Sequence, residues 1–193
     1  MRSRFRLDPL EAAVAERRKL RADAQRNEDR LLVAAAAAFT RDGANASVKD
    51  IAKEAGVGVG TLYRRFPSKE LLIEATYRNE VQRLCDAAPD LATELPPAGA
   101  LRAWMERFID FMTTKDGMAD VLRVVLTDEG EKLETRAMLA TAIERLLTAD
   151  MRPDANAHDV LMALGGISLI AASEGRRDLA GRLIDLLLHG ILV

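Results

Sequence analysis

The sequence predicts an all-α protein, and three observations support this prediction. Alanine and leucine dominate its 193 residues, whereas β-branched and aromatic residues are sparse outside a few clusters. Apolar residues recur every three or four positions, which is the spacing of an amphipathic helix. Residues that start or stop helices stand at the ends of these periodic segments. The length and the 49% apolar content are sufficient for a buried core.

Charge is distributed unevenly along the chain. Residues 1–84 contain 17 Lys or Arg and 12 Asp or Glu, a net charge of +5. Residues 85–193 contain 11 and 18, a net charge of −7. A basic N-terminal part favours contact with a polyanion, although a net charge of this size also arises by chance.

The N-terminal part begins with a basic extension, residues 1–23. It is expected to be a disordered arm, a helix with a thin apolar face, or residues ahead of the true start. The first firm helix is predicted over residues 28–41, where Leu31, Ala35 and Phe39 repeat at intervals of four.

The next segment predicts two short helices joined by a tight turn. Gly43 ends the first helix, and Ser47 is a good N-cap with Asp50 in the capping-box position. The helix that follows must end at Gly56, which suits the left-handed residue that closes a helix. Gly58 then occupies the N-cap position of the next helix, where glycine is tolerated.

That next helix has an apolar inner face, formed by Leu62 and Phe66, and a polar, basic and aromatic outer face. At Gly60 the absence of a side chain lets another backbone approach. The arrangement is typical of a helix-turn-helix that lies in the DNA major groove, here over residues 47–66. The outward residues are Val59, Gly60, Thr61, Tyr63, Arg64 and Arg65.

A dinucleotide-binding loop is the competing interpretation of the glycine spacing. The G-x-G-x-x-G pattern needs a third glycine where this chain has Tyr63, and it needs a strand before the loop. A capped helix precedes the glycines instead, so this interpretation is rejected.

The stretch SVKDIAKEAGVGVGTLYRRFPSKELL resembles the DNA-binding domain of the tetracycline-repressor (TetR) family of bacterial regulators. The shared pattern is a capped helix ending in Ala-Gly-Val, a short turn, Gly-Thr-Leu-Tyr-x-x-Phe and Pro-Ser-Lys-Glu. The similarity covers about residues 24–84. One departure is Gly58, because members of the family often have a capping serine there.

Residue type and the resemblance together assign roles on DNA. Val59 and Thr61 are expected to meet base edges, and Tyr63 resembles the family tyrosine that contacts a backbone phosphate. The arginines are expected to reach phosphate or guanine; a solvated charged face is the alternative. The predicted DNA-binding residues are Ser47, Gly58, Val59, Gly60, Thr61, Tyr63, Arg64, Arg65 and Lys69.

Residues 85–193 are predicted to form a second helical domain for ligand binding and dimerisation. The proline-containing stretch DAAPDLATELPPAGA is expected to break the fourth helix near Leu84. A Met-rich and aromatic stripe follows, which forms either plain core or the wall of an apolar ligand pocket. The candidate pocket residues are Leu101, Trp104, Met105, Phe108, Met112, Met118 and Leu122.

The last two helices, HDVLMALGGISLIAASEG and RRDLAGRLIDLLLHGILV, are more apolar than outer helices need to be. The resemblance implies that they form a four-helix dimer interface and that the middle helices enclose a small-molecule pocket. The candidate interface residues are Leu161, Gly165, Gly166, Leu179, Leu183, Leu186 and Leu187.

The leading hypothesis is therefore a homodimeric repressor that a small, mostly apolar effector releases from a pseudo-palindromic double-stranded DNA operator. A ligand-independent adaptor or an activator is the alternative. An enzyme is not expected, because no nucleophile elbow, P-loop, HExxH or Cys/His cluster is present, and no cofactor or metal site is expected. The chain has a single cysteine, which cannot form an internal disulfide. It shows neither a secretory signal nor an apolar run of the ~20 residues that a membrane span needs. These features predict a cytoplasmic protein.

Overall fold

The computed structural model describes residues 9–174 and 176–193, and it confirms the all-α prediction. Within these ranges the only extended pairing is an isolated bridge between Met151 and Leu192. In chain order the elements are α1 (Pro9–Asp42), the 3₁₀ turn η1 (Gly43–Asn45), α2 (Val48–Glu54), α3 (Val59–Arg65), α4 (Lys69–Glu94), α5 (Pro97–Gly117), α6 (Ala119–Val125), α7 (Glu129–Glu144), α8 (Ala157–Glu174) and α9 (Arg177–Ile191).

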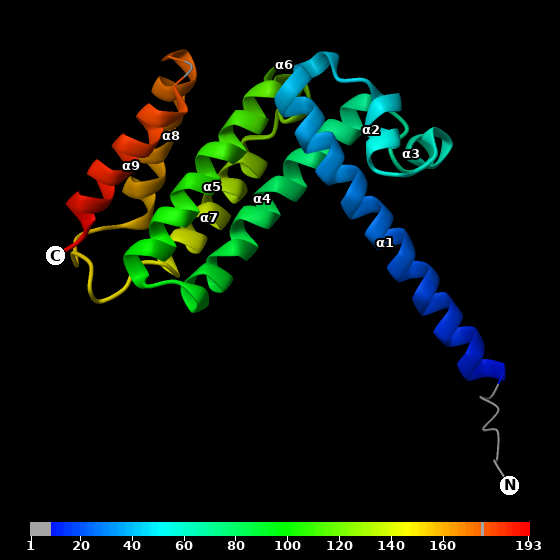
Figure 1. Cartoon of the computed structure of the whole chain (residues 1–193), viewed down its shortest axis with the longest axis horizontal. Helices are drawn as coiled ribbons and strands as arrows, with labels where there is room; N and C mark the ends of the chain where they lie inside the picture. The colour runs from blue at the N-terminus through cyan, green and yellow to red at the C-terminus, as the bar shows by residue number, and fades with distance from the viewer. Residues whose placement is uncertain (1–8, 175) are drawn as a thin grey trace, which may run out of the picture.

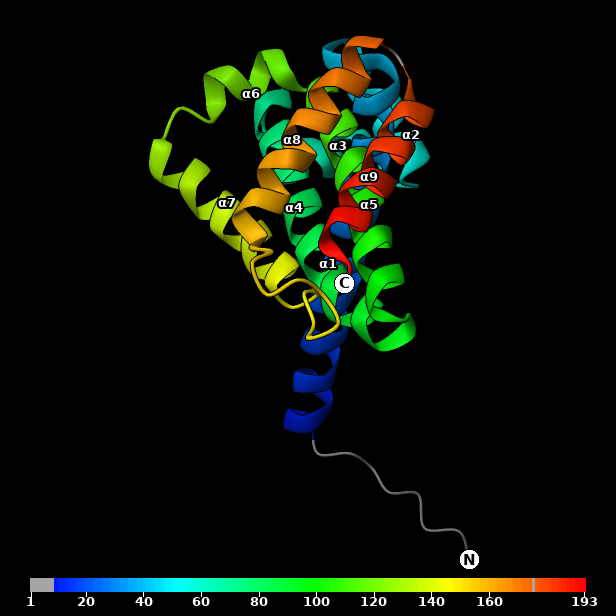
Figure 2. The same cartoon turned by 90° about the vertical axis from the view of Figure 1, so that its left-hand side faces the viewer.

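The helices form a small head and a larger body. The second half of α1 packs with α2 and α3 to make the head, and α4 runs from the head into the body (Figure 1). In the body α4 packs against both α5 and α7, and α8 and α9 form the edge farthest from the head (Figures 1 and 2).

The N-terminal helix is longer than predicted. It begins at Pro9, where proline is well suited to the first helical turn, and not near residue 28. The described part of the basic extension is therefore helical, and residues 1–8 lie outside the described residues. This first half of α1 projects away from all other elements (Figures 1 and 2), and its Arg17, Arg18 and Lys19 are exposed.

The expected break of the fourth helix near Leu84 is wrong. Helix α4 continues through Pro89 to Glu94. Proline removes one backbone hydrogen bond, but Leu84, Ala88 and Leu91 around it are buried against the body, and this packing outweighs the local preference. The indole of Trp104 on α5 also donates a hydrogen bond of 2.9 Å to the Leu84 carbonyl, which ties the two helices together.

The head has the predicted helix-turn-helix geometry. Phe39, Ile51 and Leu62 are buried together in its core. Helix α2 ends because Gly56 has a φ of +68°, and the backbone N–H of Val57 donates to the Ala52 carbonyl at 3.0 Å. The left-handed glycine thus reverses the chain within a few residues and aims α3 away from α2.

Head and body meet where the C-terminus of α5 touches the end of α1. Gly117 lies so close to α1 that a Cβ atom on it would overlap the Phe39 carbonyl oxygen. One turn earlier, the hydroxyl groups of Thr114 and Thr40 lie 2.9 Å apart and share a hydrogen bond. The junction therefore depends on a backbone contact that only glycine permits.

The first prediction concerns this junction. Gly117→Ala should lower the free energy of unfolding by about 1–3 kcal/mol, because the added methyl group meets backbone, which cannot rotate away. Gly181→Ala on α9 is the matched control, since a Cβ there would meet nothing within 4 Å. Thermal and urea unfolding of both variants would check this. Equal stability of the two variants would contradict the tight junction.

Candidate nucleic-acid interface and body cavity

Helix α3 is held at its start by backbone groups alone. The Gly58 carbonyl accepts hydrogen bonds from the Thr61 and Leu62 N–H groups at 2.9 and 3.2 Å, and no side chain caps the helix. At the start of α2, by contrast, the Ser47 hydroxyl accepts a hydrogen bond from the Asp50 N–H at 3.3 Å. The predicted cap at Ser47 is confirmed, and Gly58 leaves α3 without one.

The outer face of α3 presents few obstacles to a binding partner. A Cβ on Gly60 would meet nothing within 4 Å, so the helix backbone is open on that side. Tyr63 is 47% exposed, and Arg64 is exposed next to it. The half-buried Thr61 accepts a hydrogen bond from Arg64 at 3.5 Å. Apolar, polar and basic groups thus lie together on one accessible surface.

Two predicted DNA contacts already have partners inside the protein. Val59 is only partly exposed: it is half-buried and packs against the core. The Arg65 guanidinium forms a 2.6 Å ion pair with Glu28 on α1. Exposed pairs of this kind contribute up to about 1 kcal/mol, so Arg65 helps to position α3 on α1.

Lys69 is also engaged inside the head. Its ammonium group donates hydrogen bonds of 2.6 Å to the carbonyl oxygens of both Ala44 and Ala46. Ser68 caps the same helix by accepting from the Leu71 N–H at 3.3 Å. Lys69 therefore joins the turn before α2 to the start of α4, a structural role that the sequence did not indicate.

Four of the predicted pocket residues do not border a cavity. The side chains of Leu101, Trp104, Met105 and Met118 are fully buried in the core. For these four the plain-core alternative is correct. A helix of 21 residues buries more than one stripe when it packs against neighbours on several sides, and α5 packs against α1, α4, α8 and α9.

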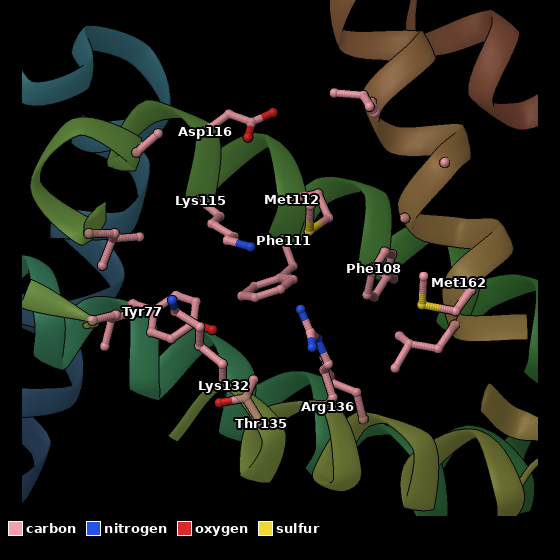
Figure 3. Close-up of a pocket in the computed structure, with 18 of the residues that line it drawn as sticks. Tyr77, Phe108, Phe111, Met112, Lys115, Asp116, Lys132, Thr135, Arg136 and Met162 are labelled. Atoms are coloured by element: carbon pink, nitrogen blue, oxygen red, sulfur yellow. The ribbon is translucent and has the colours of Figure 1, made fainter. Parts of the chain in front are cut away.

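The remaining three predicted residues, Phe108, Met112 and Leu122, do line a cavity. It has a volume of about 590 Å³, lies among α4, α5, α6, α7 and α8, and falls in the size range of small-molecule sites (Figure 3). Tyr77 from α4 and Phe111 from α5 complete its aromatic wall. Their ring centroids lie 5.9 Å apart.

The basic groups of this cavity were not among the residues predicted from the sequence. Lys115, Lys132 and Arg136 line it, and Figure 3 shows the nitrogen atoms of Lys115 and Arg136 pointing toward the same space beside Phe111. One signal was available: Lys115 follows Phe111 by four residues and Phe108 by seven, so helical spacing places it on the same face of α5.

The last two helices each have a buried side and an apolar outer side. Leu161 is a correction to the predicted interface, because its side chain is buried. It lines the cavity together with Gly165 and Gly166. The half-buried residues Leu179, Leu183 and Leu187 lie on α9 beside Leu186. The large apolar side chains most exposed on α8 and α9 are Met162, Leu169, Ile170 and Leu186.

Two other kinds of site are absent from the part of the chain that the structure describes, a membrane-spanning helix and a metal-binding cluster. There, no helix combines the length and the hydropathy that crossing a membrane requires. In the same ranges no three His, Cys, Asp or Glu side chains are grouped so as to hold a metal ion.

Comparison with known proteins matches both parts of this structure. Residues 31–76 match the family of bacterial regulatory proteins described as tetR family. Residues 96–193 match the C-terminal domain of SbtR-like transcriptional regulators. The chain belongs to the TetR family. It is a transcriptional regulator whose DNA-binding element is the helix-turn-helix of α2 and α3.

Solved structures of other TetR regulators agree over most of the chain. The regulator SCO0520 from Streptomyces coelicolor is 46% identical, with a TM-score of 0.76 over 86% of this chain and 98% of its own. A regulator from Mycobacterium vanbaalenii is 29% identical, with a TM-score of 0.68 over 90% of this chain and 99% of its own.

A match by sequence covers a shorter part of the chain. The HTH-type regulator SAR0097 from Staphylococcus aureus is 33% identical over 99 residues, which are 48% of this chain and 51% of that regulator.

The second prediction separates Tyr63 from Lys69. Tyr63→Ala should weaken binding to all DNA sequences without changing the melting temperature, because the side chain is exposed and phosphate contacts carry little sequence information. Lys69→Met should lower stability by about 1–3 kcal/mol, because two hydrogen bonds from a charged group to backbone carbonyls are lost. Gel shifts and thermal unfolding on the same samples would measure both.

Lys49→Met is the control for the lysine substitution, since Lys49 is exposed on α2. It should leave the melting temperature unchanged. A Lys69→Met protein as stable as this control would refute the structural role of Lys69.

Proposed function

We propose that this TetR regulator is a cytoplasmic, homodimeric repressor that leaves its operator when a small molecule enters the cavity of the body. The supporting observation is where the cavity lies relative to the junction. Met112 and Lys115 on α5 line the cavity. On the same helix, Thr114 and Gly117 contact α1 of the head. A ligand that moves the last turn of α5 therefore acts directly on the head.

Helix α4 provides a second connection. Tyr77 borders the cavity, and two turns earlier Lys69 is bonded to the turn that precedes α2. A ligand that favours a body conformation with wrongly spaced α3 helices lowers DNA affinity. By linkage, DNA lowers ligand affinity by the same factor.

The proposed DNA contacts use the open face of α3. Thr61 and the backbone at Gly60 meet base edges, and Tyr63 and Arg64 reach phosphate or guanine edges. Ser47 at the start of α2 adds a phosphate contact. Lys69 and Arg65 act mainly by fixing the position of α3 and α4, as their internal partners favour.

The proposed dimer uses the outer sides of α8 and α9. Contiguous exposed apolar side chains mark interaction sites in soluble proteins. Dimerisation through α8 and α9, as the resemblance to the family implies, would give a two-fold axis that places two α3 helices on one DNA duplex. The proposed interface contains Gly166, Leu179, Leu183, Leu186 and Leu187, together with Met162 and Leu169.

The third prediction tests DNA recognition. Selection of bound sequences from a random pool should enrich an inverted repeat, because a two-fold dimer binds two equivalent half-sites. Thr61→Val should alter the preferred bases, since each good base contact discriminates by ~1–3 kcal/mol, whereas Tyr63→Phe should keep the same consensus. If selection enriched no sequence, or only single half-sites, the proposed operator recognition would fail.

The fourth prediction tests the dimer. Leu186→Glu should convert the protein to a monomer and abolish operator binding, because it places a charge in an apolar interface. Leu133→Glu on α7 is the matched control, since Leu133 is 61% exposed and Leu186 is 69% exposed. Light scattering at micromolar concentration would separate the two. A dimeric Leu186→Glu protein, or a monomeric wild type, would exclude this interface.

A further inference from the structure

The walls of the cavity are apolar, but its charge is strongly one-sided. Four basic side chains line it, Lys115, Arg123, Lys132 and Arg136, against the single acidic side chain of Asp116. The imidazole of His158 also lines the cavity. This excess of positive charge is unexpected in a body domain that is acidic overall.

Two of these basic groups already have acidic partners outside the cavity. Lys132 lies 2.6 Å from Glu129, and Arg123 lies 3.6 Å from Asp120. Lys115 and Arg136 form no ion pair with any residue that the structure describes. Figure 3 shows the Asp116 carboxylate pointing away from both of them. These two cations therefore face the cavity without an ion-pair partner among the described residues.

The position of Lys115 is electrostatically unfavourable for its charged form. Burial lowers the pKa of its ammonium group; Asp116 opposes this effect, and the charge of Arg136 lowers the pKa further. Two like charges that face one space disfavour each other, whereas an anion between them would be favourable to both. The hydroxyl groups of Tyr77 and Thr135 border the same space and can donate hydrogen bonds.

The uncharged part of the lining is mostly apolar. Phe108, Met112, Leu139 and Leu161 supply hydrocarbon and thioether surface. A fully apolar molecule would leave the two cations without a partner. A highly charged molecule would leave the apolar side chains without a hydrophobic contact. A ligand that satisfies both sides has an apolar chain or ring and one anionic end.

We propose that the effector is an amphipathic organic anion whose headgroup binds between Lys115 and Arg136. Its hydrocarbon part lies against Phe108, Met112 and Leu161. The assignment rests on the proposed effector site and replaces the mostly apolar ligand that the sequence suggested. It also places the headgroup two residues from Gly117, where the body touches the head.

Two pairs of probes test the headgroup while the hydrocarbon part is held constant. These are decanoate with decan-1-ol, and 1-naphthoate with 1-naphthylmethanol. Calorimetry with the full-length protein should show that, for at least one pair, the carboxylate binds tenfold or more tightly than the alcohol. Lys115→Met and Arg136→Met should each weaken carboxylate binding about tenfold and leave alcohol binding unchanged.

Arg83→Met is the control for total charge, because Arg83 lies on α4 outside the cavity and pairs with Glu80 at 3.0 Å. It should bind the carboxylate as the wild type does. The proposal is overturned if the alcohols bind as tightly as the carboxylates, if neither pair binds, or if Arg83→Met loses as much affinity as Arg136→Met.

A gel shift with the same probes distinguishes this inference from the proposed function. Carboxylate binding that depends on Lys115 but leaves operator affinity unchanged would uphold the anion site and refute effector-driven release. Release of the operator by a neutral molecule, with no carboxylate binding, would refute the anion site and uphold effector-driven release.

Discussion

The contact between Gly117 and the Phe39 carbonyl fixes how the head of this regulator sits on its body. Both partners are backbone, so the contact cannot adapt by a change of rotamer. The hydrogen-bonded hydroxyls of Thr114 and Thr40 hold the same two helices one turn away. A junction of this kind transmits small displacements, because close-packed backbone moves as a unit. The proposed effector cavity lies against the same last turn of α5, so a ligand there can act on this junction.

Basic residues in the head fall into two groups that sequence alone does not separate. Arg64 has an exposed side chain that donates a hydrogen bond to Thr61 on its own helix, and it can reach DNA. Arg65 and Lys69 are bonded to Glu28 and to the carbonyls of Ala44 and Ala46. A bound phosphate would compete with these internal partners. Their contribution to affinity is therefore expected through the orientation of α3 and α4 more than through direct attraction.

Local chemistry made the head predictable. Ser47, Gly56 and Gly58 each act through hydrogen bonds or a φ angle that is set within a few residues, so their positions in the sequence define the turn. The body depends on tertiary packing, and there prediction was less successful. Pro89 should end a helix by local rules, yet burial of its neighbours carries α4 onward. Which face of α5 meets a neighbour and which meets the cavity is likewise set by the other helices, so Trp104 and Met105 were misplaced while Phe108 and Met112 were not.

Helix α8 has one further consequence for regulation. Met162, Gly166 and Leu169 lie on one side of α8, where they border the cavity and are also exposed. In a dimer built on that side, the wall of each effector site would rest on the neighbouring subunit. Filling one site would then change the energy of filling the second, because both share the packing between subunits. The regulator would respond to effector concentration with a steepness that a single subunit cannot produce.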